Sequence, residues 1–598
     1  MAAVGTTGDD SSPGTGETLG SAPEEPLPMI TMTTCPFRLN DEVLKHYQLT
    51  KEIGRGAFGS VWEAQDREKP DRKVAVKKML ITDGEQAEAF ENEAKTMMKL
   101  HHKNICRLFE VYRKGRLMSF IMELCPGKDV FDAMHEQEEH TFGEAKVADI
   151  IKQASSALCY AHENRVAHRD IKPENMVFVN QDPSCTWIKL IDWGLAFHFG
   201  NRRLKTVVGT PGYCAPEVLQ SGTFFNSSYS QACDIWSLGI TTYVMLCGKM
   251  PFFGAQWQQA KMMKKEQFPM QDATWQAISP EAKDFVKSLL RFDPKKRAPF
   301  DKVLKHPWFT VHRQISEISA QAAQQVLRNM QNFSQLGHFH SICVAAVARQ
   351  LDSHNLNDVH RIFCNLDRDG NGVLTLQEVK DGFESILHPD SEELKQLERI
   401  FAELDMDGNG YIDYTEFCAA GVGERVVLED SALWAAFDSF DAGHHDGQIT
   451  LDEIARVLAD ANVQQVWSKE QLEEAAKKAL DKFDKDKNGS ITFEEFSDFM
   501  RAETKARRKA RARRSSLLGD MSEETEKIEE ELADVTDVSI KNQGKVYDLV
   551  DQMNPERKSW RKWLWNTITC SLGGRVGVPT SLPSAPADVD DFAAQPRI

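Results

Sequence analysis

The amino-acid sequence predicts a multidomain α+β protein with a small β-rich lobe, a larger helical lobe and a separate all-α module of four similar units. Between Tyr47 and about Lys78, short runs rich in β-branched residues alternate with turns. From Thr141 to Phe309, apolar residues recur at helical spacing. Farther along, a helix–acidic loop–helix pattern recurs, which is an internal repeat. Its acidic loops begin at Asp367, Asp405, near Asp441 and at Asp484.

The secondary structure of the first lobe follows from local patterns. The runs YQLTKEI, SVWEAQ and RKVAVKK predict strands, and residues 85–100 predict a helix. Two further strands are predicted near 106–112 and 117–124. The second lobe then begins with a long amphipathic helix, for which Thr141 and Glu144 fit a capping box.

Composition excludes several classes of protein. The 598 residues carry a net charge of −18, which is opposite to the basic surface of a nucleic-acid binder. No apolar run reaches the ~18–20 residues of a spanning helix, and the first residues lack the pattern of a secretory signal. The 12 cysteines are scattered without any CxxC pair, as is typical of reduced thiols. We therefore expect a cytoplasmic protein, with a peripheral membrane or nuclear location left open.

Changes in composition along the chain predict five segments. The first is rich in Gly, Ser, Thr and Pro, and we expect it to be disordered. The two lobes follow, then a helical connector, the repeated module, and a charged extension that we expect to be partly disordered. Their predicted bounds are 1–44, 45–309, 310–350, 351–502 and 503–598.

A glycine-rich motif in the first lobe indicates a phosphate-binding backbone. Gly54, Gly56 and Gly59 lie in IGRGAFGSV, where the missing side chains let main-chain N–H groups approach phosphate oxygens. In a dinucleotide-binding fold this motif opens a helix, whereas here it runs into a strand-like stretch. Lys77 follows and can neutralise phosphates, and Glu93 on the next predicted helix can hold that lysine in place.

A second motif, HRDIKPEN at 168–175, carries the groups that phosphoryl transfer needs. Asp170 can accept the proton of a substrate hydroxyl, and Lys172 can neutralise the transferred group. Asn175 and Asp192 can supply oxygen ligands to Mg²⁺. Such chemistry requires positioning and charge neutralisation more than covalent participation by the protein.

With these motifs, residues about 47–309 resemble a eukaryotic protein kinase domain of the serine/threonine class. VAVK, HRDIKPEN, DWG, GTPGYCAPE, DIWSLG and HPWF all match. The resemblance implies that Asp234 anchors the catalytic loop and that Glu217 pairs with Arg297. Two departures are Trp193, where the family usually has phenylalanine, and Asp129, where it usually has glutamate. The residues that the resemblance implies for ATP binding are Ile53, Gly54, Gly56, Gly59, Val61, Lys77, Glu123, Cys125 and Asp129.

Three of the acidic loops have the ligand spacing of an EF-hand calcium site. Alternate oxygens point inward, a central glycine permits the turn, and a final glutamate closes the site with two oxygens. The apolar residues Leu374, Ile412 and Ile491 are expected to pair the loops two by two. The predicted calcium ligands are Asp367, Asp369, Asn371, Val373 and Glu378; Asp405, Asp407, Asn409, Tyr411 and Glu416; and Asp484, Asp486, Asn488, Ser490 and Glu495.

The remaining unit is degenerate. Its loop from Asp441 to Glu453 has one residue too many, and alignment on Gly447 and Glu453 puts Ala442 first and His444 third. Two oxygen ligands would then be lost, so weak or absent calcium binding is expected. We predict three calcium ions per chain, a number that native mass spectrometry measures directly; four filled sites would contradict it.

The order of a kinase domain, a connector and four EF units resembles the calcium-dependent protein kinases of plants and protists. The resemblance implies that the connector blocks the substrate cleft at low calcium, and that EF-hands filled with calcium capture it. Between 350 and 500 the only methionines are Met406 and Met500, unlike the Met-rich grooves of promiscuous calcium sensors, so we expect that no external calmodulin is needed. VLRNMQNF at 326–333 looks like the inhibitory helix, although it is poor in Lys and Arg. A rigid spacer helix remains an alternative.

Two other classes of function remain to be weighed. A non-enzymatic sensor or scaffold would be expected to lose Lys77, Asp170, Asn175 and Asp192, and all four are present. A calmodulin-dependent kinase with accessory EF-hands usually has a different connector and fewer EF units. The resemblance also implies protein substrates, with a preference for Arg three residues before the target that Glu174 and Asp129 support mildly. Regulatory phosphorylation of Thr206, paired with Arg169, is left open.

The charged extension contains two notable stretches. Residues 503–518 are basic and can continue the last helix, while Ser516 stands in a context for basophilic phosphorylation. Residues 555–575 place Trp560 and Trp563 beside basic side chains. This segment could pack on the protein, lie at an anionic membrane or occupy a partner's groove.

Overall fold

The computed structural model describes most of the chain between the N-terminal segment and the charged extension. No helix in the part that it describes has the length and apolar character to cross a bilayer. Our predictions for Thr206, Asp407, Ala442, His444, Ser516 and 555–575 fall outside the described residues. The described residues are 37–39 and 42–505, except for gaps at 57–58, 68–71, 139, 200–207, 222–229, 313–318, 337, 352–355, 388–391, 407, 423–429, 442–446, 461–468 and 503–504.

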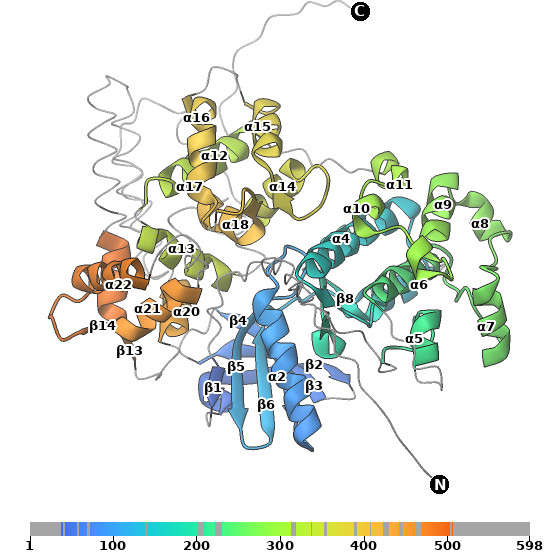
Figure 1. Cartoon of the computed structure of the whole chain (residues 1–598), viewed down its shortest axis with the longest axis horizontal. Coiled ribbons are helices and arrows are strands. Elements are labelled where there is room, and N and C mark those ends of the chain that lie inside the picture. The colour runs from blue at the N-terminus through green and yellow to red at the C-terminus, as the bar shows by residue number, and fades with distance from the viewer. Residues whose placement is uncertain are drawn as a thin grey trace, which may run out of the picture. The chain divides into compact units, whose positions relative to one another are not determined.

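The β-rich lobe is a six-stranded sheet in the order β1-β5-β6-β4-β3-β2, with α2 packed against it (Figure 1). Asp83 caps α2 by accepting a hydrogen bond from the main-chain N–H of Gln86. The elements of this lobe are β1 Phe37–Leu39, α1 Val43–His46, β2 Tyr47–Gly56, β3 Gly59–Asp66, β4 Lys73–Leu80, α2 Gly84–Lys99, β5 Leu108–Lys114 and β6 Leu117–Met122.

The segment 1–44 was expected to be disordered throughout, and that prediction is wrong at its end. Phe37–Leu39 forms β1, which pairs in parallel with β5 through Phe37 opposite Val111. Residues 43–44 belong to α1. Pairing with a strand some seventy residues away supplies the order, and the composition of the segment carries no sign of it.

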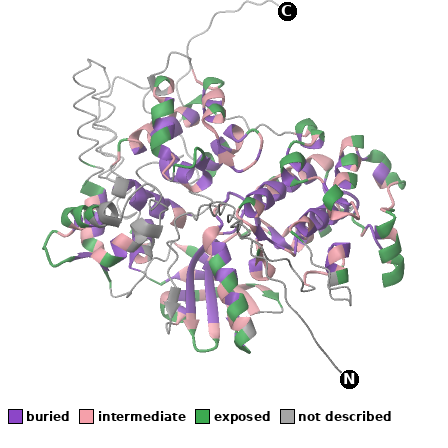
Figure 2. Cartoon of the chain, viewed as in Figure 1, coloured by how far each residue is buried: buried purple, intermediate pink, exposed green. Residues whose placement is uncertain are grey.

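The helical lobe is organised around α4 and α6, whose residues are mostly buried (Figure 2). Its elements are α3 Val130–His135, α4 Glu144–Glu163, β7 Val166–Ala167, β8 Met176–Phe178, β9 Ile188–Leu190, β10 Phe197–His198, α5 Pro216–Ser221, α6 Ala232–Cys247, α7 Gln256–Lys264, α8 Ala273–Ala277, α9 Pro280–Leu289, α10 Phe300–Val303 and α11 Pro307–Val311, with short 3-10 turns at Pro173–Asn175, Trp193–Leu195 and Pro294–Lys296.

The predicted capping box of α4 is not formed. Gly143 is the N-cap residue, and it provides no side-chain cap. The Glu144 carboxylate instead accepts hydrogen bonds from Ser279 at 2.5 Å and from the Trp308 indole at 2.9 Å. Glu144 therefore links α4 to α11 and to the start of α9, because the Trp308 indole and the N-cap residue Ser279 both donate to it.

The connector and the four EF units form a second apolar core. Leu374 pairs with Ile412, and Ile449 pairs with Ile491, so the loops are joined two by two as predicted. The elements are α12 Ala320–Phe333, α13 His338–Gln350, α14 Asn357–Leu366, β11 Val373–Leu374, α15 Leu376–Glu384, α16 Glu392–Lys395, α17 Leu397–Leu404, β12 Ile412–Asp413, α18 Tyr414–Gly421, α20 Asp430–Phe440, β13 Gln448–Thr450, α21 Leu451–Asp460, α22 Lys469–Phe483 and β14 Ser490–Thr492.

The glycines of the β2–β3 hairpin differ in whether the packing of the protein requires them. A Cβ at Gly59 would lie 1.9 Å from the main-chain oxygen of Lys78, so the approach of β3 to β4 requires glycine there. Among the described residues, a Cβ at Gly54 would meet nothing closer than Val61 at 3.9 Å, and one at Gly56 would meet nothing within 4 Å. The packing of the protein itself does not demand glycine at these two positions.

This difference predicts opposite outcomes for two matched substitutions. Gly59→Ala should destabilise the β-rich lobe by about 1–3 kcal/mol, because the new methyl group overlaps main-chain atoms that cannot rotate away. Gly56→Ala should change the free energy of unfolding by less than ~0.5 kcal/mol. Denaturant unfolding of the two variants and the parent measures both values. Equal destabilisation by the two substitutions would contradict the assignment.

Candidate functional site

Three charged side chains from different elements meet beside the glycine-rich hairpin. Lys77 on β4 places its Nζ 2.7 Å from Glu93 Oε1 of α2 and 2.9 Å from Asp192 Oδ1. Burial opposes the charge of Lys77, but the two carboxylates outweigh burial and raise its pKa above the ordinary value. Burial also favours the neutral form of Asp192, yet Lys77 outweighs it and lowers the pKa of that carboxyl. The lysine and Asp192 are therefore both charged at neutral pH.

The loop that carries HRDIKPEN brings Asp170, Lys172 and Asn175 together. Lys172 Nζ lies 2.9 Å from Asp170 Oδ2, and Asn175 Nδ2 donates to the main-chain oxygen of Asp170 at 2.7 Å. Burial raises the pKa of Asp170, but hydrogen bonds from Lys172 and Thr210 outweigh burial and lower it below the ordinary value. Asp170 is therefore an ionised acceptor held in a fixed position.

Thr210 is a part of this site that our sequence analysis did not assign. Its hydroxyl donates to Asp170 Oδ1 at 2.7 Å and accepts from Lys172 Nζ at 2.8 Å. Its main-chain N–H donates to the same carboxylate oxygen at 2.9 Å. The motif GTPGYCAPE contains this threonine, but its local sequence does not indicate which distant side chain the hydroxyl contacts.

Asp234, on α6, holds the main chain of the same loop. Its carboxylate accepts from the N–H groups of His168 at 2.9 Å and Arg169 at 2.8 Å, and it lies 2.8 Å from His162 Nε2. Arg169 has a φ of 70° and Asp192 one of 63°, in the left-handed region that non-glycine residues seldom adopt. Strained backbone of this kind persists where surrounding contacts enforce it.

The structure shows the surroundings of Trp193 and Asp129, the two residues that depart from the usual pattern of the resembled family. Trp193 is completely buried, with its ring centroid 4.5 Å from that of His168. Asp129 caps α3 by accepting from the main-chain N–H of Asp132 at 2.8 Å. Burial raises the pKa of Asp129. The bulkier ring is accommodated in the core, and the shorter acid is used as a helix cap.

In the segment predicted to bind adenine, the main-chain N–H of Glu123 donates to the main-chain oxygen of Arg107 at 2.9 Å. Glu123 is buried, and its carboxylate pairs with Arg107 at 3.2 Å and with Lys189 at 3.1 Å. Cys125 and Val61 are partly buried, and Ile53 is exposed. Glu123 thus belongs to a buried ion-pair cluster with Arg107 and Lys189.

The carboxylates of the first and fourth loops converge as a cation site requires. Asp367, Asp369 and Glu378 have oxygens within 4.8 Å of one another, as do Asp484, Asp486 and Glu495. Among the described atoms, Asp367 Oδ1 is buried without a hydrogen-bond partner. These donor sets fit Ca²⁺, which prefers carboxylate and carbonyl oxygens.

In the second loop, Asp405 and Glu416 make the same internal contacts. Gly410 N–H donates to Asp405 at 2.8 Å, and Met406 N–H donates to Glu416 at 2.9 Å. Asn409 and Tyr411 are exposed. In the other two loops, Asn371 and Asn488 accept from the residues two positions on, Val373 and Ser490, at 2.9 Å and 2.8 Å.

The alignment that placed Ala442 first in the third loop is wrong. Gly447 N–H donates to Asp441 Oδ2 at 2.8 Å, which is the contact that Gly372 makes with Asp367 at 3.1 Å and Gly489 makes with Asp484 at 2.8 Å. Asp441 therefore takes the first position, and the additional residue is accommodated between Asp441 and Gly447. The hydrogen bond from Gly447 to Asp441 identifies this alignment. Counting residues backward from Glu453 at the usual spacing does not reveal it.

The connector contributes its apolar face to the EF module. Buried side chains along α12 belong to the same core as α14, α17 and α18, and Asn329 donates to the main-chain oxygen of Gly421 at 2.8 Å. The face of α12 that carries Ala323, Val326, Leu327, Met330 and Phe333 is thus covered by EF helices in this structure.

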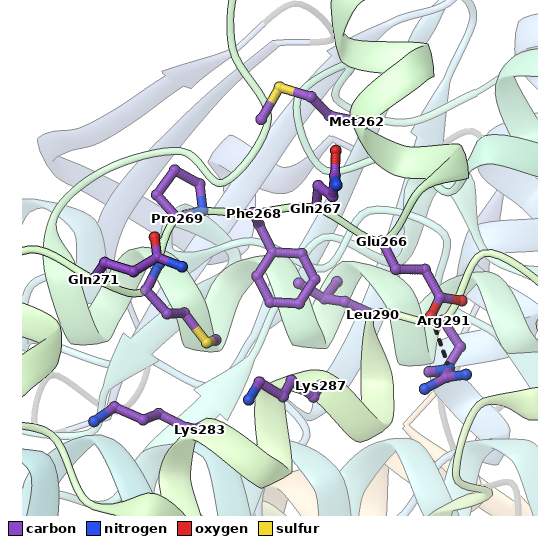
Figure 3. A pocket seen from close by; sticks show the side chains of 11 residues that line it. Met262, Glu266, Gln267, Phe268, Pro269, Gln271, Lys283, Lys287, Leu290 and Arg291 are labelled. Atoms are coloured by element: carbon purple, nitrogen blue, oxygen red, sulfur yellow. Dashed lines mark hydrogen bonds and ion pairs between the residues drawn. The ribbon is translucent and has the colours of Figure 1, made fainter.

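A cavity of about 770 Å³ lies away from all these residues, between the loop after α7 and helix α9 (Figure 3). Phe268 and Met262 line one part, and Lys283 and Lys287 of α9 line another. An ion pair between Glu266 and Arg291 lies at one end. The cavity contains none of the side chains predicted to act on phosphate or metal.

Comparison with known proteins matches both halves of the chain. The family model described as protein kinase domain matches residues 47–309, and that of the EF-hand domain pair matches 356–420 and 430–501. Calcium-dependent protein kinase 3 of Plasmodium berghei is 34% identical over 462 residues, covering 76% of this chain and 80% of the relative. Calcium-dependent protein kinase 14 of Arabidopsis thaliana is 30% identical over 478 residues, covering 79% and 86%.

The buried position of Asp234 predicts a pH-dependent contribution to stability. Asp234→Asn should lower the free energy of unfolding by about 1–3 kcal/mol. Both carboxylate oxygens of Asp234 accept hydrogen bonds, whereas an amide has only one oxygen that can accept. Hydrogen bonding and nearby histidines outweigh burial and lower the pKa of Asp234 from 3.8. The difference should therefore be constant above about pH 5 and shrink as pH falls below 3.8 through the native value.

Denaturant unfolding at several pH values measures this difference. Asp284→Asn is the matched control. The Asp284 side chain is 78% exposed, and its ion pair with His306 is long at 3.4 Å. It should change the free energy of unfolding by less than ~0.5 kcal/mol. An Asp234→Asn protein as stable as the parent at pH 7 would refute the assigned role.

Proposed function

Because this chain belongs to the calcium-dependent protein kinase family, we propose that the side chains gathered around Asp170 transfer the γ-phosphate of ATP to protein serine or threonine. The enzyme is a protein kinase that uses ATP, Mg²⁺ and Ca²⁺. Two groups of contacting side chains support this assignment of residues. Lys77, Glu93 and Asp192 form the first group. Asp170, Lys172 and Thr210 form the second.

Each residue has a defined task in this proposal. Lys77, held by Glu93, neutralises the α- and β-phosphates, and the main chain between Gly54 and Gly59 covers them. Asp170 orients the substrate hydroxyl and accepts its proton, while Lys172 stabilises negative charge on the transferred group. Asn175 and Asp192 would hold Mg²⁺, which neutralises phosphate charge when bound. Asp234 keeps the loop in the strained conformation that aims Asp170.

Regulation is proposed to depend on the connector. The apolar face of α12 lies in the EF core, where its removal from water stabilises the captured arrangement. When calcium is lost and that core opens, the apolar face of α12 would be exposed to water. We propose that the face then packs against the substrate site and obstructs it. Few basic side chains lie on α12, so steric obstruction is favoured over mimicry of a substrate. Calcium then biases a bistable helix, and no separate calmodulin is needed.

A preference for basic substrates is supported by Glu174. Its Oε2 is buried without a hydrogen-bond partner among the described residues, and burial raises its pKa. Asp129 is close enough to add to that shift. A guanidinium from a substrate arginine would satisfy both carboxylates. Thr206 phosphorylation, cytoplasmic location and membrane or partner contact through 555–575 stay predictions.

The test is phosphorylation of a serine peptide with arginine three positions earlier by the purified full chain. We expect the rate to rise at least about tenfold when calcium replaces a chelator at constant magnesium, without added calmodulin. Asp170→Asn should abolish transfer under both conditions. Equal rates with and without calcium would disprove calcium control, and dependence on added calmodulin would disprove the internal sensor.

Thr210 provides a sharper test of the transfer site. Thr210→Ala removes the hydroxyl shared by Asp170 and Lys172, and it should lower kcat about ten- to a hundredfold through misplacement of both groups. Thr210→Ser keeps the hydroxyl and should retain most of the activity. Steady-state kinetics with the same peptide distinguishes them. If serine and alanine variants lose activity equally, the hydroxyl does not position these side chains.

A further inference from the structure

The first calcium loop differs from the second and fourth loops in its surroundings. A Cβ at Gly372 would come within 2.2 Å of His102 Nε2, and one at Gly370 within 2.7 Å of Lys152 Cε. His102 and Lys152 belong to the kinase domain. A Cβ at the corresponding positions Gly408, Gly410 and Gly489 would have no described residue within 4 Å. Among these glycine positions, only those of the first loop lie against described residues of the kinase domain.

Within this contact, Lys103 lies on a predicted calcium ligand. Its Nζ is 2.5 Å from Asp367 Oδ2, and the two side chains are only 6% and 0% exposed. The ammonium also lies 5.0 Å from the centre of the Phe363 ring on α14. A salt bridge so completely removed from water is costly to break on one side only, because it leaves a buried charge.

Neighbouring contacts hold the lysine in this position. The Trp187 indole donates to the main-chain oxygen of Lys103 at 3.2 Å, and its ring stacks on His360 of α14 with centroids 3.4 Å apart. Lys103 thus reaches the loop from a turn that is itself fixed to the EF module.

We propose that Lys103 competes with Ca²⁺ for Asp367, so that filling of the first EF loop weakens its attachment to the kinase domain. Asp367 is the first ligand of that loop, and its other oxygen, Oδ1, is buried without a partner among the described atoms. An ion seated on this carboxylate would stand within a few ångströms of the lysine ammonium. Repulsion between a divalent ion and a buried ammonium is strong, because little water screens it.

By thermodynamic linkage the effect is reciprocal. If calcium weakens the contact of Lys103 with the loop, the contact weakens calcium binding by the same factor. The first site should therefore need more calcium than its ligand set implies. In the fourth loop, Lys485 pairs with Asp498, which is not a predicted ligand. Among the described residues, no ion pair joins a lysine to Asp484, Asp486 or Glu495.

The experiment measures calcium binding to the full chain at the first loop alone. Glu416→Gln, Glu453→Gln and Glu495→Gln remove the closing acids of the other three loops, and isothermal titration then follows the first loop alone. In this background, Lys103→Gln should lower the calcium concentration for half-saturation at least about fivefold. Lys103→Arg keeps the charge and should bind as the parent does. The outcome that overturns the proposal is unchanged or weaker calcium binding by Lys103→Gln.

Lys380→Gln is the matched control, because it removes a lysine from the same EF unit that pairs with Glu398, which is not a ligand. It should change half-saturation less than about twofold. A shift as large as that of Lys103→Gln would show a general charge effect and overturn the proposal.

A second measurement needs no substitution at Lys103. Hydrogen exchange of the otherwise unaltered chain should show loss of protection at residues 101–105 when calcium is added, and no such loss in Glu378→Gln. Unchanged protection in the unaltered chain overturns the proposal. The inference rests on the proposed calcium control, and the experiment distinguishes failure of the inference from failure of that control. A chain that binds no calcium refutes both, whereas equal binding by the parent and Lys103→Gln refutes the inference alone.

Discussion

The buried carboxylate of Asp234 constrains the whole transfer site. It accepts from two successive N–H groups of the catalytic loop, and this holds Arg169 in a left-handed conformation. Asp170 then points toward Lys172 and Thr210, which fix its charge and its position. Because α6 is almost wholly buried, the anchor itself cannot move without disturbing the core of the helical lobe.

The connector joins this rigid site to a metal-responsive module. Its helix α12 has one strongly apolar face, and such a face must be covered wherever the helix lies. In this structure EF helices cover it. The proposed regulation adds a second cover for this face at the substrate site, and such a switch requires no new chemistry at either end.

The calcium loops are not equivalent in this arrangement. The first lies against the kinase domain, where His102, Lys103 and Lys152 surround it, while the second and fourth lack such contacts at their glycines. Identical ligand chemistry in different electrostatic surroundings gives different affinities. Under the competition proposed for Lys103, the first loop fills at a higher calcium concentration than its ligands alone would require.

The sequence by itself determined what depends on short stretches of chain. The EF loops, the glycine-rich hairpin and HRDIKPEN bring their groups together within about a dozen residues, so spacing alone defines their chemistry. Tertiary structure decided what depends on distant partners: β1 paired with β5, Glu144 bound to Ser279, Thr210 on Asp170, and Lys103 on Asp367. It also decided the register of the third loop, where Asp441 is selected by its contact with Gly447. Local patterns carry no record of such contacts, because each partner is an ordinary residue until the fold places it.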